Sequence, residues 1–440
     1  MSFRISVTFL LVFTLLSSAA IAQSLDTIRV MSYNLLNYRN NSISGCSNTN
    51  NNPSTKENNL KTIIDFYLPE ILVCNEIGTS DPAASFRILQ NALNQNGRTY
   101  YNLTNMQTGA RQNNNGSATG NMIYWDTRKL ELHSSDYIEF DPFNRALVRV
   151  IDLYRLYYKD PNLAVHGDTI FINIFIAHLK AGNTTADRNE RDWATDAVMA
   201  YLDSNNISGN YLFAGDLNLY TATENAYQNL INYSVPALRF YDPINVAGNW
   251  SNNSPFAIVH TQSTRTTGGC GAGGGMDDRF DFILASDEIM NGTDSLRYIN
   301  NSYKALGQDG FRFNGSLTGT PTNNSAPTAV LQAMESLSDH LAVQIDLELS
   351  YPQSTSLAEQ TEALNIGINN PVAELLYIRV EDPQQINRLQ LLNMAGQVIW
   401  ELRPEARQIE QDCSDLKAGV YFIKVIGNQG EVSIQKLIKI

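Results

Sequence analysis

The sequence predicts a mixed α/β domain followed by a small all-β unit, and three observations support this fold class. Between residues 26 and 350, apolar strand-like runs alternate with helix-like segments and polar loops, a pattern typical of sheets covered by helices. Beyond residue 370, short alternating strands follow one another without a helical pattern. The length of 440 residues is sufficient for two or three domains, each with its own core.

The predicted strands of the first region are short runs rich in β-branched and aromatic residues. They are expected at 28–34, 71–74, 121–125, 146–153, 169–177, 211–214, 280–284 and 341–349. Helices are expected at 60–67 and 187–201, where apolar residues recur with helical spacing. The Asn- and Ser-rich segment 40–59 is predicted to be an exposed or flexible loop.

The composition is that of a globular protein that is neither disordered nor embedded in a membrane. Apolar residues make up 43% of the chain and charged residues 17%, which is enough apolar surface to build cores. The net charge of −13 argues against a protein that binds nucleic acid nonspecifically through a basic surface.

Residues 1–22 are predicted to be a secretory signal peptide. Arg4 provides a positive start, residues 5–16 form a short apolar stretch, and Ala20-Ile21-Ala22 offers a cleavage site between small residues. A membrane anchor is the alternative, but the apolar stretch is short for a span and no basic cluster follows it. No other segment is long and apolar enough to cross a bilayer, so no stable membrane span is expected.

Export would bring the four cysteines into an oxidising compartment, where disulfides persist. Cys74 lies in an apolar run and is predicted to be a buried thiol. Cys46 and Cys270 lie in polar loops and could pair, although the sequence does not determine the connectivity. The Gly-rich run 268–275 lacks the Lys-Ser/Thr of a phosphate-binding loop and is interpreted as a flexible loop at the rim of a site.

The C-terminal unit is predicted to follow a linker at 351–370 and to occupy residues 371–440. Five strands are expected within it, at 373–380, 386–392, 397–402, 420–426 and 432–438. So many short strands in fewer than ninety residues favour a β-sandwich. The unit contains no His and no motif that resembles a catalytic site.

Polar residues capable of chemistry lie at the ends of the predicted strands, where α/β sheets present their sites. The first three are Asn34, Glu76 and His178. Taken alone, Asn34 is typical of a turn, Glu76 of a loop acid and His178 of a buried structural His. A carboxylate that follows an apolar strand is also a suitable ligand for a hard cation such as Mg²⁺.

The remaining strand ends carry Asp216, Asn218, Asp281 and the pair Asp339-His340. Asp216 and Asn218 are two residues apart and would point to the same side of an extended segment, although a turn closed by the Asp216 side chain fits them as well. A carboxylate such as Asp281 could orient the imidazole of His340, as a general base requires. Each acid alone could also be a solvated loop residue.

As an ordered set, these residues resemble the endonuclease/exonuclease/phosphatase superfamily, whose founding shape is deoxyribonuclease I. The most specific segments are GDLN at 215–218, DDRFDFIL at 277–284 and SDHLAV at 338–343, and the resemblance extends over about residues 28–349. It implies a four-layered α/β/β/α sandwich that cuts phosphate esters with Mg²⁺, or with Mn²⁺ or Ca²⁺. The predicted catalytic domain is 26–350.

The resemblance also implies a role for each residue. Glu76 matches the main metal carboxylate, with Asn34 and Asp339 near the metal and the attacked phosphate. His340 matches the residue that activates the water, and Asp281 its orienting partner.

Four further residues receive roles in the same way. His178 matches a second His that contacts the phosphate or protonates the leaving oxygen. Asp216 and Asn218 match a pair that positions nucleophile and phosphate. Arg145 matches an Arg that faces the phosphate in many relatives, although a surface Arg is an equally ordinary interpretation.

The C-terminal unit resembles the sorting domains of the type IX secretion system. The matching segments are Asn370-Pro371-Val372, residues 393–397, residues 416–425 and a Lys-Leu-Ile-Lys stretch near the end. The resemblance implies export through the periplasm to the cell surface or the medium, with the secretion machinery as partner. A β-sandwich that binds carbohydrate or another protein is the alternative.

Together these observations predict a secreted, divalent-metal-dependent phosphodiesterase, acting as a monomeric extracellular endonuclease on DNA or RNA. The alternative is a lipid or small-molecule phosphoesterase of the sphingomyelinase or sugar/inositol phosphatase type. An exposed apolar hairpin would favour lipid and an Arg/Lys-lined groove would favour nucleic acid. No apolar hairpin is evident in the sequence. A third possibility is a surface protein that kept the fold without catalysis.

Overall fold

The computed structural model describes residues 26–105, 118–205, 207–349, 366–394, 396–428 and 432–440. The chain divides into two compact units, Met1–Pro352 and Gln353–Ile440. The predicted signal peptide and most of the predicted linker lie outside the described residues.

Two β-sheets form the centre of the first unit. The first sheet has the strand order β11-β13-β1-β2-β4-β3, with β12 beside β13, and the second has the order β5-β6-β7-β8-β10-β9. The strands of the first sheet are β1 (Thr27–Tyr38), β2 (Ile71–Gly78), β3 (Tyr101–Leu103), β4 (Thr119–Asp126), β11 (Leu296–Tyr298), β12 (Lys304–Ala305) and β13 (Val343–Leu349). Those of the second are β5 (Leu130–Phe140), β6 (Ala146–Tyr158), β7 (Phe171–His178), β8 (Tyr211–Asp216), β9 (Phe240–Tyr241) and β10 (Asp281–Ser286).

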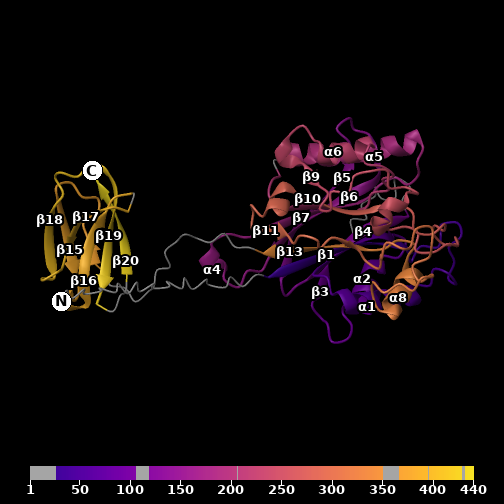
Figure 1. Ribbon diagram of the computed structural model, residues 1–440, viewed down its shortest axis with the longest axis horizontal. Helices are drawn as coiled ribbons and strands as arrows, with labels where there is room; N and C mark the ends of the chain where they lie inside the picture. Colours follow the sequence, from indigo (N-terminus) through magenta and orange to yellow (C-terminus); the bar gives the residue numbers. More distant parts are fainter. Residues whose placement is uncertain (1–25, 106–117, 206, 350–365, 395, 429–431) are drawn as a thin grey trace, which may run out of the picture. The chain divides into compact units, whose positions relative to one another are not determined.

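Helices cover the outer face of each sheet (Figure 1). The first sheet is covered by α1 (Pro53–Tyr67), α2 (Ala84–Ile88), the π-helical turn η1 (Leu89–Leu93) and α8 (Thr328–Leu337). The second is covered by α5 (Thr185–Ser204) and α6 (Asn225–Ile231). The remaining helical segments are α4 (Leu163–His166), α7 (Asp287–Asn291), η2 (Pro236–Leu238) and η3 (Ser254–Val259). The four-layered α/β/β/α sandwich that the resemblance implied is therefore confirmed.

The alternation of side chains along the strands builds three apolar layers in this unit. Along β1, Val30 packs between the two sheets, and its neighbour Met31 packs beneath the helices of the first sheet. Along β8, Leu212 faces the space between the sheets and Phe213 faces α5 and α6. Because successive side chains of a strand point to opposite faces, an almost continuous apolar run is what a doubly covered strand requires.

Strand direction brings the polar ends of six strands to one edge of the sandwich. Strand β1 runs parallel to β2, and β7 runs parallel to β8, so these four strands end on the same side. Strand β10 is antiparallel to β8 and begins opposite its end, with Asp281 paired to Asp216. Strand β13 is antiparallel to β1 and begins just after Asp339 and His340.

The loop predicted at 40–59 is wrong in its second half, because α1 begins at Pro53. The start signals are present: Pro53 occupies the first turn, and the Asn52 side chain accepts a hydrogen bond from the Thr55 amide at 3.0 Å. The apolar spacing does not reveal this turn because the residues that α1 buries there are Lys56 and Glu57.

The second unit is a β-sandwich, as predicted. A sheet of β14, β15 and β18 and a sheet with the order β17-β16-β19-β20 share one apolar core. The strands are β14 (Ile366–Ile368), β15 (Leu375–Val380), β16 (Ile386–Leu392), β17 (Val398–Leu402), β18 (Gln408–Asp412), β19 (Gly419–Gly427) and β20 (Val432–Lys439), with the turn η4 at Pro383–Gln385. Strand β14 lies within the stretch that was predicted to be a linker. It was not predicted because three residues are too few to show the alternation of a strand.

Among the residues described, no helix combines the length and the apolar character needed to cross a bilayer.

A chain of buried polar side chains runs between the two sheets of the first unit. The Asn121 amide donates to Asp152 Oδ2 at 2.9 Å, and the Asn75 amide donates to Asn121 Oδ1 at 2.8 Å. Asn75 Oδ1 in turn accepts a hydrogen bond from the backbone amide of Asp216 at 3.1 Å. Burial raises the pKa of Asp152 to about 8, opposed only by the hydrogen bond from Asn121. The raised pKa favours the protonated form of Asp152 at neutral pH.

We predict that Asp152→Asn changes how stability depends on pH. The unfolded chain loses the Asp152 proton near pH 4, whereas the folded chain keeps it to about pH 8. The stability due to this proton is therefore fully present below about pH 4 and declines as the pH rises towards 8, by at most about 1.4 kcal/mol per pH unit. As the pH rises from 5 to 8, the melting temperature of Asp152→Asn should increase relative to that of the wild type.

The matched control is Asp168→Asn, which changes an exposed acid in the loop before β7. Its melting temperature should follow the wild type at each pH. A constant difference between Asp152→Asn and the wild type from pH 5 to pH 8 would contradict the raised pKa.

Candidate active site

Two carboxylates and an imidazole meet where β2, β7 and β8 end. His178 Nε2 lies 3.7 Å from Glu76 Oε1 and 3.5 Å from Asp216 Oδ2. His178 and Asp216 are buried, and the Glu76 side chain keeps 15% of its surface exposed. The cluster is therefore open to small solutes on the Glu76 side.

Asn34 connects the two carboxylates of this cluster. Its Nδ2 donates to Glu76 Oε1 and to Asp216 Oδ2, both at 3.0 Å, while its Oδ1 accepts from the Leu36 amide at 2.9 Å. Asn34 thus presents its amide N–H to the cluster, and its oxygen is used by the local turn. The second oxygen of Glu76 accepts from the Asn37 amide at 2.7 Å.

His340 forms the second half of the site, on the loop before β13. Its Nδ1 lies 2.7 Å from Asp281 Oδ2, and its Nε2 lies 3.6 Å from Asp216 Oδ2. Gln262 Nε2 approaches His340 Nε2 at 2.6 Å. An amide offers either an N–H or an oxygen, so Gln262 can serve the neutral ring or the imidazolium by turning its amide over. The predicted partnership of Asp281 with His340 is present in this geometry.

Asp339 lies against the Gly-rich loop. Its Oδ2 accepts from the Ala272 amide at 2.6 Å, and its buried Oδ1 has no hydrogen-bond partner among the residues that the structure describes. Gly271 has φ +91°, and a Cβ added there would lie 2.7 Å from Asp339 Oδ2, so glycine is required for this close approach. The Gly-rich run therefore shapes one wall of the site, as its predicted position at the rim suggested.

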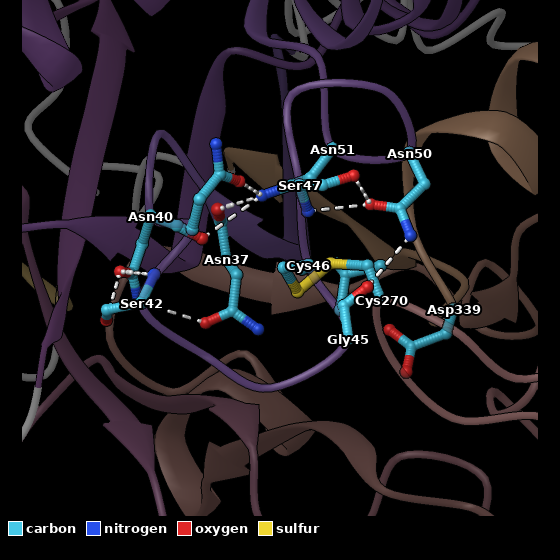
Figure 2. Close-up of a disulfide and its surroundings, with 12 residues drawn as sticks. Asn37, Asn40, Ser42, Gly45, Cys46, Ser47, Asn50, Asn51, Cys270 and Asp339 are labelled. Atoms are coloured by element: carbon cyan, nitrogen blue, oxygen red, sulfur yellow. Dashed lines mark hydrogen bonds between the residues drawn. A yellow bond between two sulfur atoms is a disulfide. The ribbon is translucent and has the colours of Figure 1, made fainter.

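A disulfide between Cys46 and Cys270 joins the Gly-rich loop to the polar loop that follows β1 (Figure 2). The sequence left this pairing open. In Figure 2, Asp339 lies close to Cys270, and the polar loop is organised by its own side chains. Asn51 Nδ2, for example, donates to the Asn37 carbonyl at 2.8 Å. The predicted buried thiol, Cys74, is free and buried.

The segment from Gly215 to Asn218 forms a turn, so the extended geometry considered for Asp216 and Asn218 is wrong. Asn218 has φ +50°, and its backbone amide donates to Asp216 Oδ1 at 3.1 Å. Its side chain donates to the Leu179 carbonyl at 3.2 Å, next to His178. A Cβ at Gly215 would lie 1.9 Å from the Ala177 carbonyl oxygen of β7, so only glycine fits beside that strand.

The structure does not bring Arg145 into the cluster. Its guanidinium pairs with Asp141 and lies over the Trp193 ring, 4.0 Å from the ring centroid. Arg149 lies four residues further along the chain, within β6, and is closer to the cluster. Its Nη1 donates to the Leu179 carbonyl at 2.7 Å and to the His178 carbonyl at 3.3 Å.

Burial and neighbouring charges shift the pKa values of the site in opposite directions. Burial, with Arg149 and His340 nearby, holds the pKa of His178 well below its usual range. Burial also lowers the pKa of His340, but the Asp281 and Asp216 carboxylates outweigh it and raise that pKa well above its usual value. Burial and repulsion from Asp281 and Glu76 raise the pKa of Asp216 to about 7, against the opposing effect of His340.

The donor set fits a divalent cation. Ligand atoms of Glu76, His178 and Asp216 all lie within 4.8 Å of one another, so one ion could contact all three. Carboxylate oxygens suit Mg²⁺, Mn²⁺ and Ca²⁺, and an imidazole adds affinity for a transition ion such as Mn²⁺. Of the predicted metal residues, Glu76 belongs to this set and Asn34 donates to two of its carboxylates, whereas Asp339 contacts Ala272 and Gln262.

Three residues of the site were not predicted from the sequence: Gln262, Arg149 and Asn75. Gln262 lies in a polar loop without any pattern, so the sequence carries no signal for it. Arg149 interrupts an apolar strand, and a cation at such a position is an available signal for a buried charge. Asn75 precedes Glu76 in an otherwise apolar strand and offered the same kind of signal.

Comparisons with known proteins bear on both units. Residues 370–440 match the family described as the secretion system C-terminal sorting domain. No curated protein matches the sequence. Among solved structures, the human Nocturnin catalytic domain with bound sulfate anion has 18% sequence identity and a TM-score of 0.45, and the match covers 74% of this chain and 95% of that chain.

Two other solved structures are similar at the same level. An endonuclease/exonuclease/phosphatase from Bacteroides vulgatus has 15% identity and a TM-score of 0.44, with 74% of this chain and all 100% of that chain covered. Truncated TDP2 from Caenorhabditis elegans has 16% identity and a TM-score of 0.41, with coverage of 74% and 98%.

The sorting-domain match confirms the sequence-based prediction for the C-terminal unit and for the destination of the protein. The sandwich of β14 to β20 falls almost entirely within the matched residues. Residues 370–440 therefore belong to the secretion system C-terminal sorting domain family, which addresses the chain to the cell surface or the extracellular space.

Proposed function

We propose that this secreted protein is a divalent-metal-dependent phosphodiesterase whose first candidate substrate is nucleic acid. The observation that carries the proposal is the meeting of two groups at one edge of the sandwich. One is the cation-binding set of Glu76, His178 and Asp216. The other is the His340–Asp281 pair, whose ring nitrogen lies 3.6 Å from Asp216.

His340 is proposed to accept the proton of the attacking water in its neutral form, because a cation held by Glu76 and Asp216 would offset the carboxylate charge that raises its pKa. Asp281 holds the Nδ1 side of the ring, so Nε2 is the nitrogen that remains for proton transfer. Gln262 and Asp216 lie on that side and would orient the water or receive its hydrogen bonds. His178 Nε2 faces Glu76 and Asp216, so His178 is assigned to the ion in place of the phosphate contact that the resemblance implied.

Glu76 and Asp216, with His178, would hold the ion. When bound, the ion polarises a phosphoryl oxygen and offsets the negative charge of the phosphate. The buried carboxylates support the presence of a cation, because burial and mutual repulsion already raise the pKa of Asp216 to about 7.

Arg149 is proposed as the cation that faces the phosphate, in the role that the resemblance suggested for Arg145. It contributes positive charge beside His178 and near Glu76 and Asp216. Arg145 is engaged by Asp141 and Trp193 instead.

A lipid phosphoesterase is the second candidate, because the β5–β6 hairpin ends in an exposed apolar tip. Phe140 is 42% exposed and Phe143 is 77% exposed. The Asp141 side chain orders the tip by accepting hydrogen bonds from the Phe143 and Arg145 amides at 3.0 and 2.7 Å. The tip is therefore an ordered apolar surface suited to a lipid interface.

We predict metal-dependent cleavage of a phosphodiester by the purified protein. Plasmid DNA, RNA, sphingomyelin vesicles and bis(p-nitrophenyl) phosphate should be tested with Mg²⁺, Mn²⁺ and Ca²⁺, each with an EDTA control. Cleavage of DNA or RNA is the expected result, since export and the site residues support a nuclease. Cleavage of vesicles alone would select the second candidate, and no metal-dependent cleavage of any substrate would reject the enzyme.

We predict that His340→Ala and Asp281→Asn lower kcat by about 10²- to 10⁴-fold, as is usual for the loss of general base catalysis. Glu76→Gln should raise the metal concentration needed for half-maximal activity by about 10- to 100-fold. The circular dichroism spectra should remain those of the wild type. Wild-type turnover in His340→Ala would exclude the assigned mechanism.

We predict that Arg149→Met weakens turnover of every phosphodiester by about 10- to 100-fold, because a charge-assisted contact to phosphate is lost. Arg145→Met is the matched control, four residues earlier on the same hairpin, and should keep activity on soluble substrates. Steady-state kinetics on bis(p-nitrophenyl) phosphate measures both variants. Equal losses in the two variants would remove the distinction between these arginines.

A further inference from the structure

Lys56 is a buried lysine in the first turns of α1, on the side of the helix that faces the site loops. Only 3% of its surface is exposed. Within the described part of the chain, no carboxylate forms an ion pair with it. Burial lowers the pKa of Lys56 to about 7, although Asp339 and Glu76 oppose the shift. An unpaired buried ammonium is unfavourable unless backbone groups replace its lost water.

Three backbone carbonyls replace that water. Lys56 Nζ donates to the carbonyls of Leu35, Leu36 and Leu337 at 2.8, 2.6 and 2.8 Å. An ammonium has three N–H donors, so all of them are used. Methionine of similar length could fill the same space without any of these contacts.

The three carbonyls lie at the ends of two elements next to site residues, the end of β1 and the end of α8. Leu35 and Leu36 directly follow Asn34, and Leu337 directly precedes Ser338 and Asp339. Leu36 also has φ +45°, a backbone conformation that an ordinary side chain rarely adopts without support.

A second contact joins β1 to the residue that follows α8, and it depends on the spacing of these two segments. Ser338 Oγ donates to the Asn34 carbonyl at 2.7 Å, and the His340 amide donates to Ser338 Oγ at 3.1 Å. The position of His340 relative to Asn34 therefore depends on how closely the end of β1 and the end of α8 approach. Lys56 connects them through a single charged atom.

We propose that Lys56 is a positioning residue, whose ammonium joins the end of β1 to the end of α8 and so sets Asn34, Asp339 and His340 in register. This inference rests on the proposed function for its activity readout. Its effect on the cation-binding carboxylates can be measured without any substrate.

A cavity beside Lys56 permits a direct chemical test. The lysine lines a polar cavity of about 520 Å³ together with Asn52, Thr55, Arg265 and Ser336. In Lys56→Ala, n-propylammonium supplies the three carbons and the ammonium that the truncation removes. n-Propanol has the same carbon chain without the charge and is the control solute.

The expected results separate the ammonium from the bulk of the side chain. Lys56→Met should lower kcat on bis(p-nitrophenyl) phosphate by about tenfold or more, with a smaller change in KM. It should also weaken Mn²⁺ binding, measured by electron paramagnetic resonance on the metal alone. n-Propylammonium should raise the activity of Lys56→Ala several-fold. n-Propanol should not raise the activity of Lys56→Ala, and n-propylammonium should not raise the activity of Lys56→Met.

Lys61→Met is the matched control, since Lys61 lies on the same helix and pairs with Asp65 away from the site. It should keep wild-type kcat and Mn²⁺ binding. Wild-type kcat and Mn²⁺ binding in Lys56→Met would overturn the inference, as would equal activation of the Met and Ala variants by n-propylammonium.

Folding is tested by the melting temperatures of Lys56→Met and Lys56→Arg. Lys56→Arg should keep part of the activity, because a guanidinium also donates to carbonyls. Loss of activity that follows loss of folded protein in both variants would reduce Lys56 to a structural residue. If the wild type cleaves no phosphodiester, the proposed function fails, and Mn²⁺ binding by the wild type and Lys56→Met still decides this inference.

Discussion

The approach of four carboxylates, three of them buried and Glu76 partly exposed, at one edge of two packed sheets is the constraint on which the rest of the site depends. Glu76, Asp216, Asp281 and Asp339 approach one another because their strands end or begin at that edge. Their mutual repulsion must be balanced by hydrogen-bond donors, by the imidazoles and by positive charge. The amides of Asn34, Asn37 and Ala272 and the cations Lys56 and Arg149 all serve this balance.

Strand ends were predictable from the sequence, because a polar residue that follows an apolar run is visible without knowledge of the fold. Asn34, Glu76, His178, Asp216, Asp281 and His340 were identified in this way, and the structure brings them together. Arg145 was selected for its position in a motif, and its contacts lie with Asp141 and Trp193. The residues that support the site, Gln262 and Lys56, act through long-range contacts that no local pattern contains.

The same distinction holds for the fold. Central strands such as β7 and β8 are buried on both faces and appear as apolar runs, so they were predicted. Strand β18 alternates between exposed polar residues and half-buried ones, of which only Ile409 is apolar, and β3, β9 and β12 have only two or three residues. These edge strands exist because a neighbour offers hydrogen bonds, which is tertiary information.

The bond between Cys46 and Cys270 closes the polypeptide into a covalent ring. That ring contains Glu76, His178 and Asp216, whereas Asn34, Asp281 and His340 lie on the two tails outside it. A single backbone cut anywhere between the two cysteines would leave both pieces attached through sulfur. The cation-binding residues thus sit in a segment from which one protease cleavage releases nothing, an advantage for a protein that works outside the cell.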